Sequence, residues 1–155
     1  HRRVLRHLDA VPVPVNFIAL CGHNQQAYQF LKSLDIAPHR VIPLEYQNNM
    51  AALLRAVDLA FIRPGSGTTS ECIHCHCPVL FNGLGGVMPQ ERLTLLGVQR
   101  IGIEPVVLRR ASQFGDVIGK VLCSEKRDPL NDQKRAFISF HPGGQPEDII
   151  REVVK

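Results

Sequence analysis

The stretch that decides the fold reads FIRPGSGTTSE and occupies residues 61–71. It begins with the apolar residues of a buried strand, turns at Gly65 and Gly67, and leads into a helix predicted from Thr69 to Cys75. Glycines at such a turn let a ligand approach the backbone, and the first N–H groups of a helix attract a pyrophosphate. The same glycines also suit a tight turn that binds nothing. The motif alone leaves both interpretations open.

Short apolar runs alternate with helical patterns on either side of this stretch. The alternation predicts an α/β fold with a Rossmann-like parallel sheet and helices on both faces. Ligands of such sheets bind in the crevice at the carboxyl ends of the strands. The predicted strands are Val15 to Leu20, Val41 to Leu44, Leu59 to Ile62, Val79 to Phe81 and Arg100 to Ile103. The predicted helices, besides that at Thr69, are Gln25 to Leu34, Met50 to Val57, Glu91 to Leu96, Ser112 to Leu122 and a last one opening at Pro146.

Composition bounds the domain count and the cellular setting. With 155 residues and 45% hydrophobic content, residues 1–155 are predicted to form one domain. The first residues read like the middle of a helix, without an initiator Met or a signal peptide, so we expect a piece of a longer chain. No apolar run is long enough to span a bilayer, and five cysteines, three of them crowded together, fit a reducing cytosol better than a disulfide framework.

The charge balance narrows the partners. A net charge of +4 and a pI near 9.0 favour nucleotide phosphates or an anionic membrane surface, although scattered solvated charge explains them equally well. The chain has no Trp, only two Tyr and no zinc-finger or RNA-recognition motif. Nucleic acid is therefore not an expected partner.

Glu71 has two possible roles. The run Thr68-Thr69-Ser70-Glu71 fits a capping box, in which the carboxylate returns to the backbone of the helix start. Alternatively, the carboxylate lies at the mouth of the crevice and accepts hydrogen bonds from the two hydroxyls of a ribose. The pattern does not choose between them.

A family resemblance adds to these observations. The run from Leu44 to Glu71, the Cys77-Pro78-Val79-Leu80 segment and Pro89-Gln90-Glu91 resemble, in this order, the C-terminal donor-binding domain of GT-B glycosyltransferases of family 28. That family contains the lipid II-forming N-acetylglucosaminyl transferase and the monogalactosyl- and glucosyldiacylglycerol synthases. The similarity covers about Asn16 to Gly97, over half of the chain. It implies one half of a GT-B fold.

The resemblance implies a role for each matching residue. Tyr46, Gln47 and Met50 would border the uracil, Glu71 would accept the ribose hydroxyls, and Gln90 with Glu91 would face the donor sugar. The diphosphate would lie on the turn and the helix start formed by Gly65, Ser66, Gly67 and Thr68. Gly22 and Asn24, which match a turn of the family, are expected to be structural.

The sequence also departs from the family pattern. The family's first strand of this domain, with its Gly-rich loop, is missing and is expected before His1. Thr94 stands where the family commonly has Asn, which makes the sugar side less well supported than the nucleotide side. No catalytic residue is assigned to this chain, because the general base of the family lies on the other domain.

The resemblance implies a function for the full-length protein. It would transfer a hexosyl or N-acetylhexosaminyl group from a UDP-sugar, with inversion and without a metal or other cofactor, to an acceptor hydroxyl of a lipid. The expected partner is an absent N-terminal acceptor domain, and the expected location is cytoplasmic or peripheral to a membrane. Two alternatives stay open: a non-catalytic donor-binding subunit that needs a partner chain, and a sugar-nucleotide epimerase.

The crowded segment from Cys72 to Cys77 suggests zinc as a further alternative. Cys72 and Cys75 have C-x-x-C spacing, and His76 shares their helix face. A second ligand cluster is missing from the sequence, however. We therefore expect these residues to pack against the sheet, with His76 at the position where the family has a helix-ending Gly.

Overall fold

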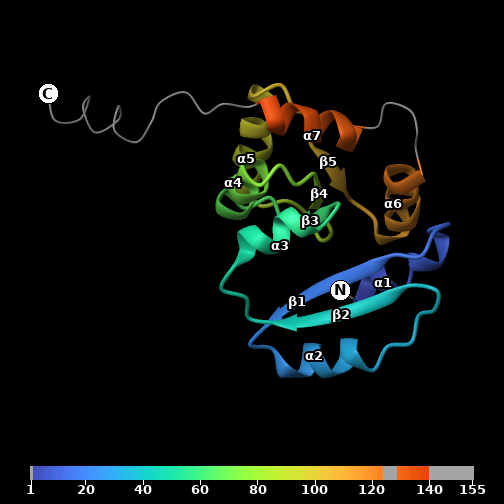
Figure 1. The fold of residues 1–155 in the computed structure, drawn as a ribbon. Helices are drawn as coiled ribbons and strands as arrows, with labels where there is room; N and C mark the ends of the chain where they lie inside the picture. Colours follow the sequence, from blue (N-terminus) through green and yellow to red (C-terminus); the bar gives the residue numbers. More distant parts are fainter. Residues whose placement is uncertain (1, 124–128, 140–155) are drawn as a thin grey trace, which may run out of the picture.

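The computed structural model describes residues 2–123 and 129–139, in which strands and helices alternate as predicted (Figure 1). Its strands are β1 (Asn16–Gly22), β2 (Arg40–Glu45), β3 (Ala60–Ile62), β4 (Val79–Asn82) and β5 (Val106–Leu108). The helices are α1 (Arg2–Leu5), α2 (Gln25–Lys32), α3 (Met50–Ala56), α4 (Ser66–His74), α5 (Pro89–Arg100), α6 (Phe114–Cys123) and α7 (Pro129–Ser139), with short 3₁₀ turns η1 (Leu8–Ala10) and η2 (Ala111–Gln113). All paired strands are parallel, which confirms the Rossmann-like α/β fold.

The parallel strands form two sheets. β1 pairs with β2, and β3, β4 and β5 pair in that order. Figure 1 shows the β1–β2 pair, with α2 below it, on one side of the molecule and the other three strands, with α3, α4, α5 and α7, on the other. In the described part of the chain, β1 and β3 each have a strand on one side alone. A further strand that paired with both β1 and β3 would join the two sheets.

Strand β4 is buried on both faces. Leu80 packs into one hydrophobic core together with Leu8, Leu31 and Leu108, while its neighbours Val79 and Phe81 point into a second core. The second core also holds Leu54, Cys72, Val98 and Phe137. Because successive side chains of a strand point to opposite faces, helices must cover both sides of this sheet. Burying Phe81 alone stabilises the fold by about 2–3 kcal/mol.

The first core joins the two sheets through side chains. The Phe114 ring, at the start of α6, lies 6.2 Å from the ring of Phe17 on β1 and 5.3 Å from that of Phe61 on β3, measured between centroids. Phe114 is only 1% exposed. Helix α6 therefore packs across the break between the sheets.

Helix α7 is fixed to the start of β4 by a buried amide. The side-chain oxygen of Gln133 accepts a hydrogen bond from the Val79 N–H at 3.1 Å, and its NH₂ group donates to the Glu104 carbonyl at 3.1 Å. Phe137, one turn later on α7, is buried in the second core. Both partners satisfy polar groups that would otherwise be buried unpaired.

One predicted strand and several predicted helix bounds are wrong. The segment Arg100 to Ile103 is not a strand, because Arg100 is the last residue of α5 and Ile101 is its C-cap. Gly102 follows with a φ of +80°, the left-handed conformation typical of a glycine after a helix. The last strand is β5, a few residues later. Helix α4 begins three residues earlier than predicted, at Ser66. The helix predicted at Pro146 lies outside the described residues.

Candidate nucleotide-binding site

The start of α4 has main-chain donors without partners. Gly65 is the N-cap residue and provides no side-chain cap. The first hydrogen bond of the helix runs from the Thr69 N–H to the Gly65 carbonyl at 3.0 Å. Three N–H groups before it, those of Ser66, Gly67 and Thr68, have no partner among the described residues. They add to the positive end of the helix dipole, and a helix start of this kind attracts anions.

The two glycines of this turn are not required by its geometry. Gly65 has φ −80° and ψ 139°, a conformation that any residue adopts. A Cβ atom added to Gly65 or Gly67 would meet no atom within 4 Å. Gly22 is different, because its φ of +56° disfavours other residues. The geometry of the turn alone therefore does not require either glycine, and the backbone there lies open to solvent.

Glu71 does not cap its helix. Since α4 begins at Ser66, the carboxylate lies in the second turn, too far along to return to the N-cap residue, so the capping-box alternative is wrong. The side chain is exposed. Thr68, Glu71 and Cys75 follow one another at the spacing of one helix side. The Cys75 Sγ lies 3.8 Å from the Ala51 carbonyl, which identifies this as the side facing α3.

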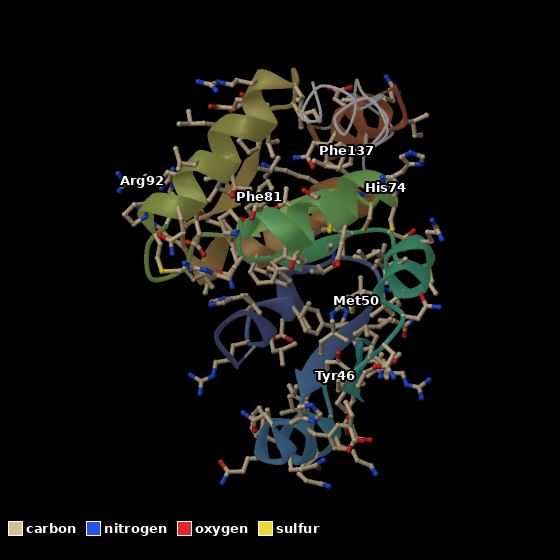
Figure 2. All side chains as sticks on the ribbon, turned by 90° about the vertical axis from the view of Figure 1, so that its left-hand side faces the viewer. Tyr46, Met50, His74, Phe81, Arg92 and Phe137 are labelled. Carbon is tan, nitrogen blue, oxygen red and sulfur yellow. The ribbon has the colours of Figure 1, made fainter. Side chains whose placement is uncertain are left out.

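The residues expected around the uracil lie between β2 and α3. Tyr46 is 61% exposed, and its ring stacks on that of His23 with 5.2 Å between centroids and an interplanar angle of 10°. The Gln47 side chain donates to the Glu45 carbonyl at 3.2 Å. Met50 opens α3 and packs against the second core. Figure 2 shows Tyr46 at the outer end of this connection and Met50 nearer to α4.

The sequence did not single out Arg63, which binds Glu91. The Arg63 Nε donates to Glu91 Oε1 at 2.9 Å, and one terminal nitrogen donates to Oε2 at 2.5 Å. The carboxylate also accepts the Met88 N–H at 2.8 Å and so caps the start of α5. Glu91 is 5% exposed, whereas the neighbouring Gln90 is exposed. The carboxylate of Glu91 is thus turned to protein groups, and its direct contact with a sugar stays a prediction.

Electrostatics keep Glu91 ionised. The hydrogen bonds from Arg63 and from the Met88 N–H lower the pKa of the Glu91 carboxyl, and burial opposes them only in part. A charged, bidentate pair of this geometry orients both side chains strongly. Its effect is to fix the loop between β4 and α5.

Residues expected to be structural have that role. Gly22 takes the left-handed conformation, and the Asn24 side chain accepts the Ala27 N–H at 2.9 Å as the N-cap of α2. His76 has φ +55° and ends α4 in a Schellman arrangement, with its N–H on the Ile73 carbonyl and the Cys77 N–H on the Cys72 carbonyl. His76 therefore occupies the expected position of a helix-ending Gly.

The cysteines in and just after α4 pack as expected. Cys72 and Cys77 are buried in the second core. The neighbouring Cys77 thiol and burial raise the pKa of the Cys72 thiol, which disfavours the thiolate that binds metals. Within residues 2–123 and 129–139, no group of three or more His, Cys, Asp or Glu side chains is placed to hold a metal ion.

An open groove of about 730 Å³ lies on the other side of α4, between α4, α5 and α7. Ser66 and Thr94 contribute to its lining, together with Ile73, Val98 and Ile138. The buried Thr69 hydroxyl in this lining has no hydrogen-bond partner among the described residues. The groove meets the helix start at Ser66 and otherwise leads away from Glu71.

Comparison with known proteins places the fold. No protein-family model matches the sequence, and no curated protein matches it. The structure matches the crystal structure of MurG from Acinetobacter baumannii with a TM-score of 0.64 and 18% sequence identity. The match covers 99% of this chain and 45% of the MurG chain, so the chain spans less than half the length of MurG. By this match, the chain has the fold of one half of MurG.

No helix among the described residues is long and apolar enough to cross a membrane.

Proposed function

We propose that this chain is the donor-binding half of a glycosyltransferase and that it binds a UDP-sugar at the carboxyl ends of its strands. One observation carries the proposal: α4 begins with three unpartnered N–H groups beside two glycines that the fold does not require. A bare helix start of this kind suits a diphosphate, which is dianionic and needs close approach to the backbone. The chain has the fold of one half of MurG, and ligands of such parallel sheets bind at the carboxyl ends of the strands.

Each part of the nucleotide has residues of suitable chemistry nearby. The diphosphate lies on the N–H groups of Ser66, Gly67 and Thr68. Glu71, exposed on the side of α4 that faces α3, accepts hydrogen bonds from the ribose hydroxyls. The uracil lies toward Tyr46, Gln47 and Met50, and the exposed Gln90 faces the sugar.

The proposed reaction is transfer of the sugar with inversion. An acceptor oxygen attacks the anomeric carbon, the bond from that carbon to the diphosphate oxygen breaks, and UDP leaves with the electron pair. The helix start stabilises the charge that builds on UDP, without a metal. The proton of the acceptor hydroxyl goes to a base outside this chain, on a further domain or a partner subunit. The acceptor in this proposal is a lipid at the cytoplasmic face of a membrane, and the positive net charge of the chain suits an anionic surface.

Titration calorimetry with UDP tests the proposal, together with a variant that closes the anion site. In Gly65→Asp, a carboxylate at the N-cap would take the N–H groups of Gly67 and Thr68. We expect UDP to bind the wild type and to raise its melting temperature. Gly65→Asp should have a higher melting temperature, because its free energy of unfolding rises by up to about 1 kcal/mol. It should nevertheless bind UDP at least tenfold more weakly, a loss of about 1.4 kcal/mol in binding free energy.

Gly97→Ala is the matched control. Gly97 lies exposed inside α5 with open space around it, so alanine should stabilise the helix by about 1 kcal/mol and leave UDP binding unchanged. A wild-type chain that binds neither UDP nor any UDP-sugar would contradict the proposal. Equal UDP affinity in Gly65→Asp and wild type would mean that the diphosphate does not bind at the start of α4.

A further inference from the structure

We infer that Arg63 is a positioning residue for the sugar side of the site, an inference that rests on the proposed function. Arg63 directly follows β3, two residues before Gly65, and it holds the loop that leads into α5. The link joins the two neighbouring turns that would bind the diphosphate and the sugar.

The Arg63 guanidinium makes four hydrogen bonds across this gap. Two go to the Glu91 carboxylate, at 2.9 and 2.5 Å. The other two go to main-chain carbonyls of the loop, Leu84 at 3.2 Å and Gly86 at 3.1 Å. A planar guanidinium offers its donors in a fixed fork, so these four acceptors define one position of the side chain and one shape of the loop.

The loop itself would otherwise have many conformations. Gly85 and Gly86 have φ of +80° and +96°, and a glycine chain loses more entropy on ordering than any other. Its ends are fixed: the Gly83 N–H bonds the Leu108 carbonyl at 2.9 Å, and a Cβ on Gly83 would lie 2.8 Å from a Val107 methyl. Between Gly83 and Met88, the Arg63 contacts are the side-chain hydrogen bonds that hold the loop to β3.

The loop in turn sets the start of α5. Met88 is the N-cap residue, its N–H binds Glu91, and Gln90 lies exposed between them in the first turn. Moving the loop would therefore move Gln90 relative to the N–H groups of α4. Since the Arg63 side chain bonds Glu91 and the loop before α5 and makes none of its hydrogen bonds to the diphosphate turn, loss of Arg63 should weaken binding of the sugar much more than binding of UDP.

The test compares Arg63→Gln and Arg63→Lys with Arg92→Gln. Arg92 is exposed on α5, at one side of Figure 2, and gives the same chemical change away from the loop. Calorimetry is done with UDP and with UDP-glucose, UDP-galactose and UDP-N-acetylglucosamine. For the sugar nucleotide that wild type prefers over UDP, both Arg63 variants should lose that preference, while UDP affinity changes by less than about threefold. Arg92→Gln should match wild type.

Amide hydrogen exchange of the nucleotide-free protein gives a second measurement. The Gly86 N–H, bonded to the Gly83 carbonyl at 3.1 Å, and the Leu84 N–H, bonded to the Asn82 side chain at 3.0 Å, should exchange faster in the Arg63 variants. Unchanged exchange in this loop would overturn the positioning role whatever the nucleotide results. Equal loss of UDP and UDP-sugar affinity would also overturn it. A wild type that binds no nucleotide would refute the proposed function, while the exchange data would still decide whether Arg63 holds the loop.

Discussion

The starts of α4 and α5 follow neighbouring strands, yet they are built in opposite ways. At α5 the Glu91 carboxylate bonds the Met88 N–H and Arg63. At α4 the N-cap is Gly65, and none of the described side chains bonds the first N–H groups. Two other helices, α2 and α3, are capped by Asn24 and Asn49. A glycine at the N-cap in place of Ser, Thr, Asp or Asn gives up roughly a few tenths of a kcal/mol of stability. The start of α5 is thus held by side chains, whereas the main-chain N–H groups at the start of α4 are left open.

Glu71→Ala is expected to have the largest effect, and it tests whether the uncapped start of α4 binds a nucleotide. If the open start binds a nucleotide, loss of the ribose acceptor should weaken UDP binding by about 1.5–3 kcal/mol, tenfold or more, because a charged hydrogen-bond partner is lost. Inorganic pyrophosphate, which has no ribose, should bind equally well to both proteins. Since Glu71 is exposed, the melting temperature should hardly change. A large drop in melting temperature, or equal losses for UDP and pyrophosphate, would contradict the ribose role.

Glu91→Gln tests the rigid start through its pH dependence. The pKa of Glu91 is lowered in the folded protein, so its ionised form stabilises the fold above the carboxyl's ordinary pKa, and this contribution disappears as pH falls through the lowered value. The variant should therefore melt below wild type at pH 7, and the gap should close on acidification below about pH 4.5. Melting curves from pH 3 to 8 measure this. A gap that is independent of pH would mean that the charge of Glu91 adds no stability.

His76→Gly changes the other end of α4 and has the smallest expected effect. A side chain at φ +55° is strained, so glycine should stabilise the protein by about 1 kcal/mol and raise the melting temperature by roughly 3 °C. UDP affinity should stay the same, because the change lies at the far end of the helix. Thermal melting and calorimetry on the same samples check both. A change in UDP affinity would mean that the end of α4, and not only its start, contributes to UDP binding.

The sequence predicts the fold far better than the details of the site. Strands β1 to β4 were predicted because apolar runs and turn residues are local signals. The segment Arg100 to Ile103 was wrongly predicted as a strand because its apolar residues, Ile101 and Ile103, occupy alternate positions as in a strand. Ile101 is in fact the C-cap of α5. The start of α4 was misplaced because Thr68-Thr69-Ser70-Glu71 matches the capping-box pattern, which predicts a helix start at Thr69. The observed start at Ser66 has no such cap.

The Arg63–Glu91 pair could not be predicted from the sequence. The two residues are 28 positions apart, and only the pairing of β3 with β4 brings their loops together. A local signal did exist for one partner: an acid two residues after Pro89 is typical of a helix start. The resemblance drew attention to Glu91 as a sugar contact, whereas the structure gives the carboxylate two protein partners.

Pro43, which faces Ala19 in the register of β1 and β2, has a consequence for assembly. The Arg40 N–H bonds the Val15 carbonyl, so by alternation along β2 the main chain of Pro43 is directed away from β1. Proline has no N–H to offer there, which makes this rim of the molecule a poor template for a neighbouring polypeptide. Recruitment of an added strand is thereby biased toward the other side of the pair, along β1, which contains no proline.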